Sequence, residues 1–253
     1  MIIYSDGCSL MAGNEHISWT MNTDTGYEEC NTVWSAVLRD VHFPTAKLYS
    51  RATTGSSNFS IARRTIHYVN QLLQTYNTKD ILVCIMWTSI YRKEYCTDKG
   101  YFTTLPTDNK LSMNEKPTGN LMDYNERKKL LEEYNLLDLS DVYYKTFNKQ
   151  NNFIYDSMAQ IDYVNLFLKT HKIKSIQCYG FGDHFINTGD KFVNSLMQKI
   201  NTYDIFYIKK FAAQGFYEWA NGSHKLGPGL HPLESAHNMW ANLLAKKYLT
   251  STL

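Results

Sequence analysis

Hydrophobic residues along the chain form short apolar runs that alternate with longer segments of helical periodicity. The short runs predict strands at Ile2–Tyr4, Lys47–Arg51, Ile81–Trp87, Ile173–Tyr179 and Ile205–Lys209. The run at Ile81–Trp87 is apolar throughout, as expected when helices cover both faces of a parallel sheet. The alternation predicts an α/β protein with a central parallel sheet of about five strands and helices on both of its faces.

The segments between these runs repeat apolar positions at helical spacing. They predict helices at Asn31–Val41, Asn58–Tyr76, Phe192–Ile200 and Leu233–Leu249. In the helix at Asn58–Tyr76, Ile61 belongs to the apolar stripe, and Arg63 and Arg64 are predicted to point outward. Pro232 suits the first turn of the last helix.

The segment at about 90–152 interrupts this alternation. It contains a polar stretch with Pro106 and Pro117, followed by charged helical sequence around Asn125–Tyr134. We interpret it as an insertion over the carboxyl edge of the sheet, either a lid or a peripheral helical elaboration. Because 253 residues suffice for one well-buried core, we predict a single domain over 1–253 that includes this insertion.

Composition narrows the class of protein. A hydrophobic content of 43% and a charged content of 20% are ordinary for a soluble globular protein, and a net charge of +2 gives no argument for a nucleic-acid partner. No stretch approaches the roughly 18 apolar residues of a membrane span, and Met1–Ser5 has no basic leader. The histidine and cysteine spacing predicts no metal or cofactor. We therefore expect a soluble, cytoplasmic protein.

Candidate chemistry lies in the loops that follow the strands, since ligands of open parallel sheets bind at the carboxyl ends of the strands. Ser9 follows the first strand and Gly7, where a serine can lie at a helix N-terminus with its hydroxyl toward solvent. Nearby backbone N–H groups would bind a developing oxyanion. After the second strand, Gly55 allows close approach of a ligand to the backbone, and Asn58 is also explained as a helix N-cap.

Four of these loops resemble, in chain order, the motifs of the SGNH/GDSL hydrolase family. The first contains Gly7-Cys8-Ser9, and the resemblance implies that Ser9 is the nucleophile. In the second, Gly55 matches an oxyanion donor, with Asn58 as possible support. In the third, Thr88 stands where the family has an asparagine donor. In the fourth, His231 before Pro232 matches the general base. The implied fold is the three-layer, flavodoxin-like SGNH fold.

Two departures from the family pattern concern the oxyanion donor and the acid. Thr88 replaces the asparagine, and Pro228 occupies the position of the aspartate that holds the histidine. A backbone carbonyl or an acidic residue from another loop must then hold the imidazole of His231. Asp183 is a candidate by its location after the fourth strand, although a turn or helix-cap role also explains it. The motif variants Gly-Cys-Ser and Trp-Thr-Ser resemble those of a divergent branch of the family that is found in bacteriophage and bacterial genomes. If the protein is encoded by a phage, this resemblance implies that it is located in the host cytoplasm or in the virion.

The resemblance implies a serine esterase or deacetylase that cleaves an acyl ester of a carbohydrate or lipid, with a small molecule or a glycan as substrate, by a Ser-His dyad or an atypical triad. Two alternatives use the same scaffold: an acyltransferase, and a binding or structural protein whose site is degenerate. A nucleotide-binding flavodoxin-like protein would need a phosphate-cradling first loop, and Gly7-Cys8-Ser9 is too sparse for one. The specific substrate and the oligomeric state stay open.

Overall fold

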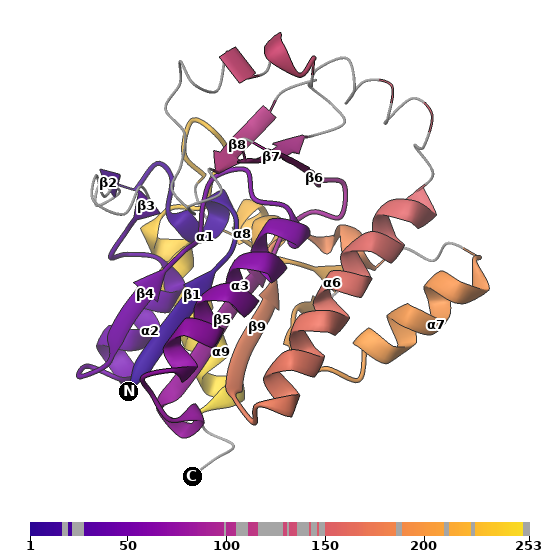
Figure 1. Ribbon diagram of the computed structural model, residues 1–253. Helices are drawn as coiled ribbons and strands as arrows, with labels where there is room; N and C mark the ends of the chain where they lie inside the picture. Colours follow the sequence, from indigo (N-terminus) through magenta and orange to yellow (C-terminus); the bar gives the residue numbers. More distant parts are fainter. Residues whose placement is uncertain are drawn as a thin grey trace.

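A five-stranded parallel sheet forms the centre of the computed structural model (Figure 1). The structure describes residues 1–16, 20–21, 28–98, 100–104, 111–115, 129–130, 132–135, 142, 146, 150–185, 189–209, 213–223 and 226–249. The sheet order is β10-β9-β5-β1-β4, formed by Ile205–Phe206, Lys174–Tyr179, Ile81–Trp87, Ile2–Asp6 and Lys47–Ser50. All its pairs are parallel. Counted along the chain this is the order 2-1-3-4-5 of flavodoxin-like folds, which confirms the predicted fold class.

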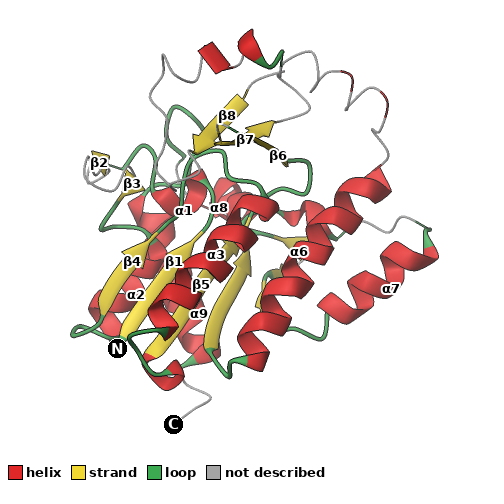
Figure 2. Cartoon of the chain, in the orientation of Figure 1, coloured by secondary structure: helices red, strands yellow, loops and turns green. Residues whose placement is uncertain are grey.

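Helices cover both faces of this sheet (Figure 2). On one face lie α2 (Trp34–His42), α8 (Phe216–Ser223) and α9 (Glu234–Tyr248). On the other lie α3 (Asn58–Leu73), α6 (Gln150–Thr170) and α7 (Lys191–Ile200). Alternate residues of β5 serve the two cores: Cys84 and Met86 pack in the first, and Val83 and Ile85 in the second. All of β5 is buried, as its apolar run predicted.

Most predicted elements are confirmed, with some differences in extent. The run at 205–209 divides, because Ile208–Lys209 (β11) leaves the sheet and pairs antiparallel with Ala213–Gln214 (β12). Helices α6 and α8 were not predicted. In α6 the side chains Tyr155, Tyr163 and Leu166 are apolar but exposed. The helix therefore lacks a clear division into an apolar and a polar face, and its sequence gives only a weak helical pattern. The described residues contain no helix long and apolar enough to cross a membrane.

The region predicted as an insertion contains a small antiparallel sheet. Its strands are β6 (Lys93–Thr97), β7 (Gly100–Thr104) and β8 (Leu111–Glu115), and they lie beyond the carboxyl ends of the central strands (Figure 1). Glu94 on β6 accepts hydrogen bonds from Arg63 and Ser60 on α3, which connects this small sheet to α3. Half of the residues of Asn125–Tyr134, where a helix was predicted, lie outside the described residues, and a lid role stays a prediction.

The remaining elements are short. They are α1 (Ser9–Ala12), the antiparallel pair β2 (Thr20–Met21) and β3 (Glu28–Glu29), and the 3-10 helices η1 (Thr78–Asp80) and η2 (Gly182–His184).

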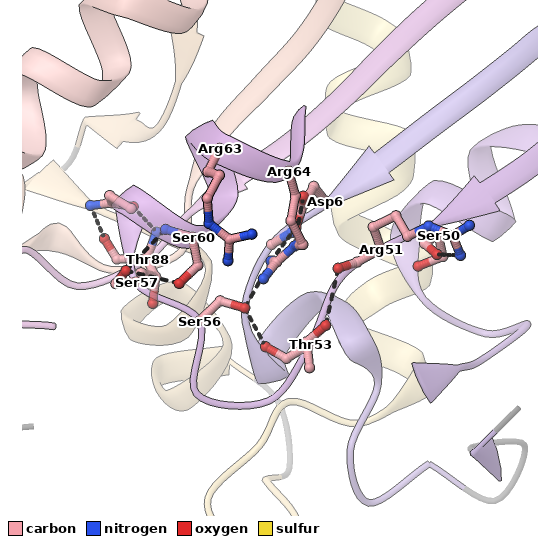
Figure 3. Close-up of polar contacts among 12 residues, drawn as sticks. Asp6, Ser50, Arg51, Thr53, Ser56, Ser57, Ser60, Arg63, Arg64 and Thr88 are labelled. Carbon is pink, nitrogen blue, oxygen red and sulfur yellow. Dashed lines mark hydrogen bonds and ion pairs between the residues drawn. The ribbon is translucent and has the colours of Figure 1, made fainter. Parts of the chain in front are cut away.

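The prediction that Arg64 points outward is wrong. Figure 3 shows Arg64 directed from α3 toward Asp6 at the end of β1, and Arg64 is 1% exposed. Its Nη2 lies 2.6 Å from Asp6 Oδ1 and its Nε lies 3.1 Å from Oδ2. Tyr4 and the Gly7 N–H also donate to this carboxylate. The ion pair of Arg64 and Asp6 fixes the first turns of α3 to the strand that leads into the Ser9 loop. Arg64 therefore points into the interior although the amphipathic pattern of its helix predicts a solvent-exposed side chain.

Candidate active site

Ser9 is the first residue of α1, directly after the loop that ends β1. Cys8 is the N-cap, and its carbonyl accepts from the N–H groups of Met11 at 2.8 Å and Ala12 at 2.9 Å. Gly13 ends the helix with φ of 76°. The helix N-terminus predicted for Ser9 is therefore present. A solvent-facing serine is not, since the residue is 5% exposed.

The loop that contains Gly55 runs beside the Ser9 loop. The Thr53 N–H donates to the Gly7 carbonyl at 3.1 Å, which continues the β1–β4 pairing beyond the sheet. Gly55 is buried and has φ of 82°, a conformation that favours glycine. The parallel pairing of β1 and β4 thus brings the second predicted loop to the same edge as the first.

Asn58 holds the loop after β5 rather than capping its own helix. The N-cap of α3 is Ser57, whose hydroxyl accepts from the Ser60 N–H. Asn58 Oδ1 accepts from the Thr88 N–H at 2.8 Å, and its Nδ2 donates to the Thr88 carbonyl at 3.1 Å. The Thr88 hydroxyl is buried and has no hydrogen-bond partner among the described residues. Asn58 therefore positions Thr88, a buried residue whose hydroxyl is left without a partner in the described part of the chain.

Three consecutive residues after α1 connect the Ser9 loop to its neighbours. Asn14 Oδ1 accepts from Thr54 Oγ1 at 2.8 Å. Glu15 accepts from the backbone N–H groups of Gly229 and His231. His16 Nε2 lies 3.0 Å from the Pro232 carbonyl. The segment Asn14–His16 thus ties the loop of the predicted nucleophile to the Gly55 loop and to the His231 loop.

Glu15 is the carboxylate that meets the imidazole of His231. Its Oε2 lies 3.4 Å from Nδ1 and 3.1 Å from the His231 backbone nitrogen. This separation places the carboxylate beside Nδ1, although Nδ1 is not aligned for a hydrogen bond. Catalytic hydrogen bonds are often long before substrate binds. An acid at Nδ1 leaves Nε2 for the nucleophile, as in Ser-His-Asp triads.

The glycines around Pro228 make room for this carboxylate. A Cβ on Gly227 or Gly229 would overlap the carboxylate oxygens of Glu15. The backbone here is also unusual, since Glu15 has φ of 73° and the exposed Leu230 has φ of 65°. Left-handed backbone at residues other than glycine is costly and is concentrated at functional sites. Both sides of the Glu15–His231 contact therefore include such a residue.

The surroundings of His231 favour a neutral imidazole. Burial lowers its pKa, the nearby Glu15 carboxylate raises it, and the charges of Arg92 and His16 lower it further. The net shift is downward from the ordinary value of about 6.5. A histidine that is neutral near pH 7 can take a proton, which is the state that a general base requires.

Asp183, predicted as a possible partner of His231, is engaged elsewhere. Its Oδ2 accepts from the Ser89 hydroxyl at 2.5 Å, and its Oδ1 lies 3.1 Å from His184 Nδ1. Among the described residues the carboxylate at the His231 ring is that of Glu15. Glu15 was not predicted as a site residue, because it lies in a turn without periodicity. The signal that was present is an acid six residues after the motif serine.

The buried His237 has a structural contact, and one large cavity lies far from this site. His237 Nδ1 accepts from the Trp34 N–H at 3.0 Å, and burial lowers its pKa well below the ordinary value. A cavity of about 580 Å³ at Ile81, Leu82 and Lys174 lies at the amino ends of the strands, opposite to the Ser9 loop. Within the described residues, no group of three or more His, Cys, Asp or Glu is placed to hold a metal ion.

The structure brings the loops of Ser9, Gly55 and His231 to one edge of the sheet, with Thr88 held at the end of β5. A direct approach of the Ser9 hydroxyl to the His231 ring stays a prediction.

Comparisons with known proteins give structural likenesses only. No family model and no curated protein matches the chain. A member of the lipolytic protein G-D-S-L family from Veillonella parvula is 11% identical with a TM-score of 0.43, over 99% of this chain and 98% of that one. An alpha/beta hydrolase from the metagenome of Lake Arreo, Spain, is 13% identical with a TM-score of 0.47, and the match covers 97% of this chain and 93% of that one. A catalytic mutant of an acetylxylan esterase from Geobacillus stearothermophilus is 12% identical with a TM-score of 0.43, and the match covers 97% of this chain and 92% of that one.

Proposed function

We propose that the protein is a serine ester hydrolase in which Ser9 is the nucleophile, His231 the general base and Glu15 the acid that orients the imidazole. The observation that carries this proposal is the contact of Glu15 with His231. Glu15 lies six residues after Ser9, so the nucleophile and the acid belong to one short segment. The arrangement supplies the acidic partner that Pro228 cannot provide.

In the proposed reaction, the Ser9 oxygen attacks the carbonyl carbon of an acyl ester while its proton passes to Nε2 of His231. The carbonyl oxygen becomes an oxyanion, which the backbone N–H groups of Ser9 and Gly55 and the hydroxyl of Thr88 stabilise. The ester C–O bond then breaks, and the imidazolium gives its proton to the leaving alcohol. Water then attacks the acyl carbon of the acyl-enzyme while its proton passes to Nε2 of His231. The bond between the acyl carbon and the Ser9 oxygen breaks, Ser9 takes the proton back from the imidazolium, and the carboxylic acid is released. The Glu15 carboxylate stabilises the imidazolium at both stages.

For the substrate class we propose an acyl ester of a carbohydrate or lipid, as the family resemblance implies.

Labelling with a fluorophosphonate probe tests the nucleophile directly. Such probes phosphonylate an activated serine, so the wild-type protein should be labelled and the Ser9→Ala variant should not. Ser89→Ala is the matched control, because Ser89 also follows a strand at this edge but donates its hydroxyl to Asp183. Equal labelling of the wild type and Ser9→Ala would refute Ser9 as the nucleophile.

Hydrolysis of p-nitrophenyl acetate tests the general base and the degenerate alternative together. We expect measurable turnover that His231→Ala reduces by at least about 1000-fold, in line with the loss of a triad member. If the wild-type protein and His231→Ala release p-nitrophenol at the same rate, the site is not catalytic. Product analysis with added alcohols would distinguish hydrolysis from acyl transfer.

A further inference from the structure

Arg92 lies at the same edge of the sheet, in the loop between β5 and β6. Its Nη1 donates to the Ser56 carbonyl at 3.1 Å, and Ser56 directly follows Gly55. Its Cζ lies 5.9 Å from the centre of the Phe181 ring, in the loop after β9. The guanidinium is therefore held between the loop of the proposed oxyanion donor and the loop of a neighbouring strand.

The charge of Arg92 acts on the proposed general base. It is one of the groups that lower the pKa of His231, so the cation opposes the imidazolium that forms during the reaction. A negative charge on the bound substrate would offset this effect of Arg92, in addition to the charge of Glu15.

Within the described residues, no carboxylate pairs with Arg92. Other arginines of the fold differ in this respect, since Arg64 pairs with Asp6 and Arg63 with Glu94. The Nε of Arg92 is buried and has no hydrogen-bond partner in the described part of the chain. A buried donor without a partner is costly, and its guanidinium presents donors in the fork geometry that matches a carboxylate.

We propose that Arg92 binds a carboxylate of the substrate, so that the preferred substrates are acyl esters with a negatively charged group close to the scissile bond. This inference rests on the proposed function, because it concerns the specificity of the same site. Arg92 is here a specificity-determining residue: it contacts the bound substrate and takes no part in the proton transfers.

Two acetyl esters of matched shape test this specificity. The acetyl ester of 3-hydroxybenzoate carries a carboxylate, and the phenolic acetyl ester of 3-hydroxybenzyl alcohol is its neutral counterpart. We expect the wild-type protein to prefer the anionic ester in kcat/KM by about 10- to 100-fold, the range that a hydrogen bond between charged groups supplies. In Arg92→Gln this ratio should fall to about one, and in Arg92→Lys to an intermediate value. Arg39→Gln is the control, since Arg39 pairs with Asp40 on α2. A ratio near one in the wild type, or an unchanged ratio in Arg92→Gln, overturns the inference.

Binding provides a test that does not depend on turnover. Calorimetric titration of Ser9→Ala with 3-hydroxybenzoate should give a Kd about tenfold or more below that for 3-hydroxybenzyl alcohol. Adding Arg92→Gln should remove the difference, and adding Arg39→Gln should preserve it. Equal affinities in Ser9→Ala overturn the inference even if the protein hydrolyses esters. Conversely, hydrolysis that persists without Ser9 refutes the proposed function while the binding measurement still decides the role of Arg92.

Discussion

Replacing Glu15 by glutamine removes one negative charge beside His231 and keeps the shape of the side chain. The amide oxygen of glutamine can still accept one of the two backbone N–H groups that Glu15 binds, so the loop at Gly229–His231 keeps part of its anchor. The change therefore tests the charge at Nδ1 with little perturbation of the fold.

The size of the effect follows from the distance and the exposure of the pair. At 3.4 Å, unit charges attract by about 5 kcal/mol at an effective dielectric constant of about 20, and by about 1 kcal/mol at that of water. The two side chains are 24% and 22% exposed, which places the pair between these limits. Since roughly 1.4 kcal/mol is a factor of ten in rate, we expect kcat/KM to fall by about 10- to 1000-fold in Glu15→Gln.

The pH dependence of kcat/KM provides a second observable with a definite sign. The base acts as a neutral imidazole, so activity should rise as pH climbs through the pKa of His231, which lies below the ordinary value. Glu15 raises that pKa. Removing its charge should therefore move the rising limb to lower pH while the plateau falls. Hydrolysis of p-nitrophenyl acetate between about pH 4 and 9 measures both effects.

Asp183→Asn is the matched control for this experiment. It removes the same charge from the other acid considered for His231, one that instead binds Ser89. We expect its pH profile to match the wild type. If Asp183→Asn shifts the limb and Glu15→Gln does not, the assignment of the acid to Glu15 is wrong.

Three further changes test separate parts of the site. Gly229→Ala would displace the flexible Glu15 side chain; we expect little change in Tm but about a tenfold loss of kcat/KM, and unchanged kinetics would contradict this. Arg64→Met leaves Asp6 charged and unpaired in the interior, so urea unfolding should show a loss of about 3–5 kcal/mol, and adding Asp6→Asn should recover part of it. Thr88→Val removes a buried hydroxyl without a partner, so unfolding should show equal or slightly higher stability, while turnover falls by about 100-fold if this hydroxyl stabilises the oxyanion.

The central sheet could be predicted from the sequence because its signals are local. The apolar run of β5 reflects burial on both faces, and Gly55 stands where a left-handed turn requires it. Contacts between distant residues leave no such signal. Arg64 follows the polar side of its helix, and only the fold reveals Asp6 beneath it, 58 positions earlier. The partner of His231 was missed for the same reason, since Glu15 lies 216 residues away.

The position of Glu15 has a consequence for recognising similar chains. A search pattern that requires an aspartate three residues before the histidine would pass over this sequence, because it has Pro228 there. In the proposed site the serine, the acid and the histidine are divided between the two ends of the chain in another way. The amino-terminal segment supplies both the serine and the acid, and the carboxyl-terminal segment supplies a histidine preceded by two small residues that leave space. A profile built on that division, G-x-S with an acid six residues later and G-x-G-x-H near the other end, would select chains in which the acid lies in the amino-terminal segment instead of beside the histidine.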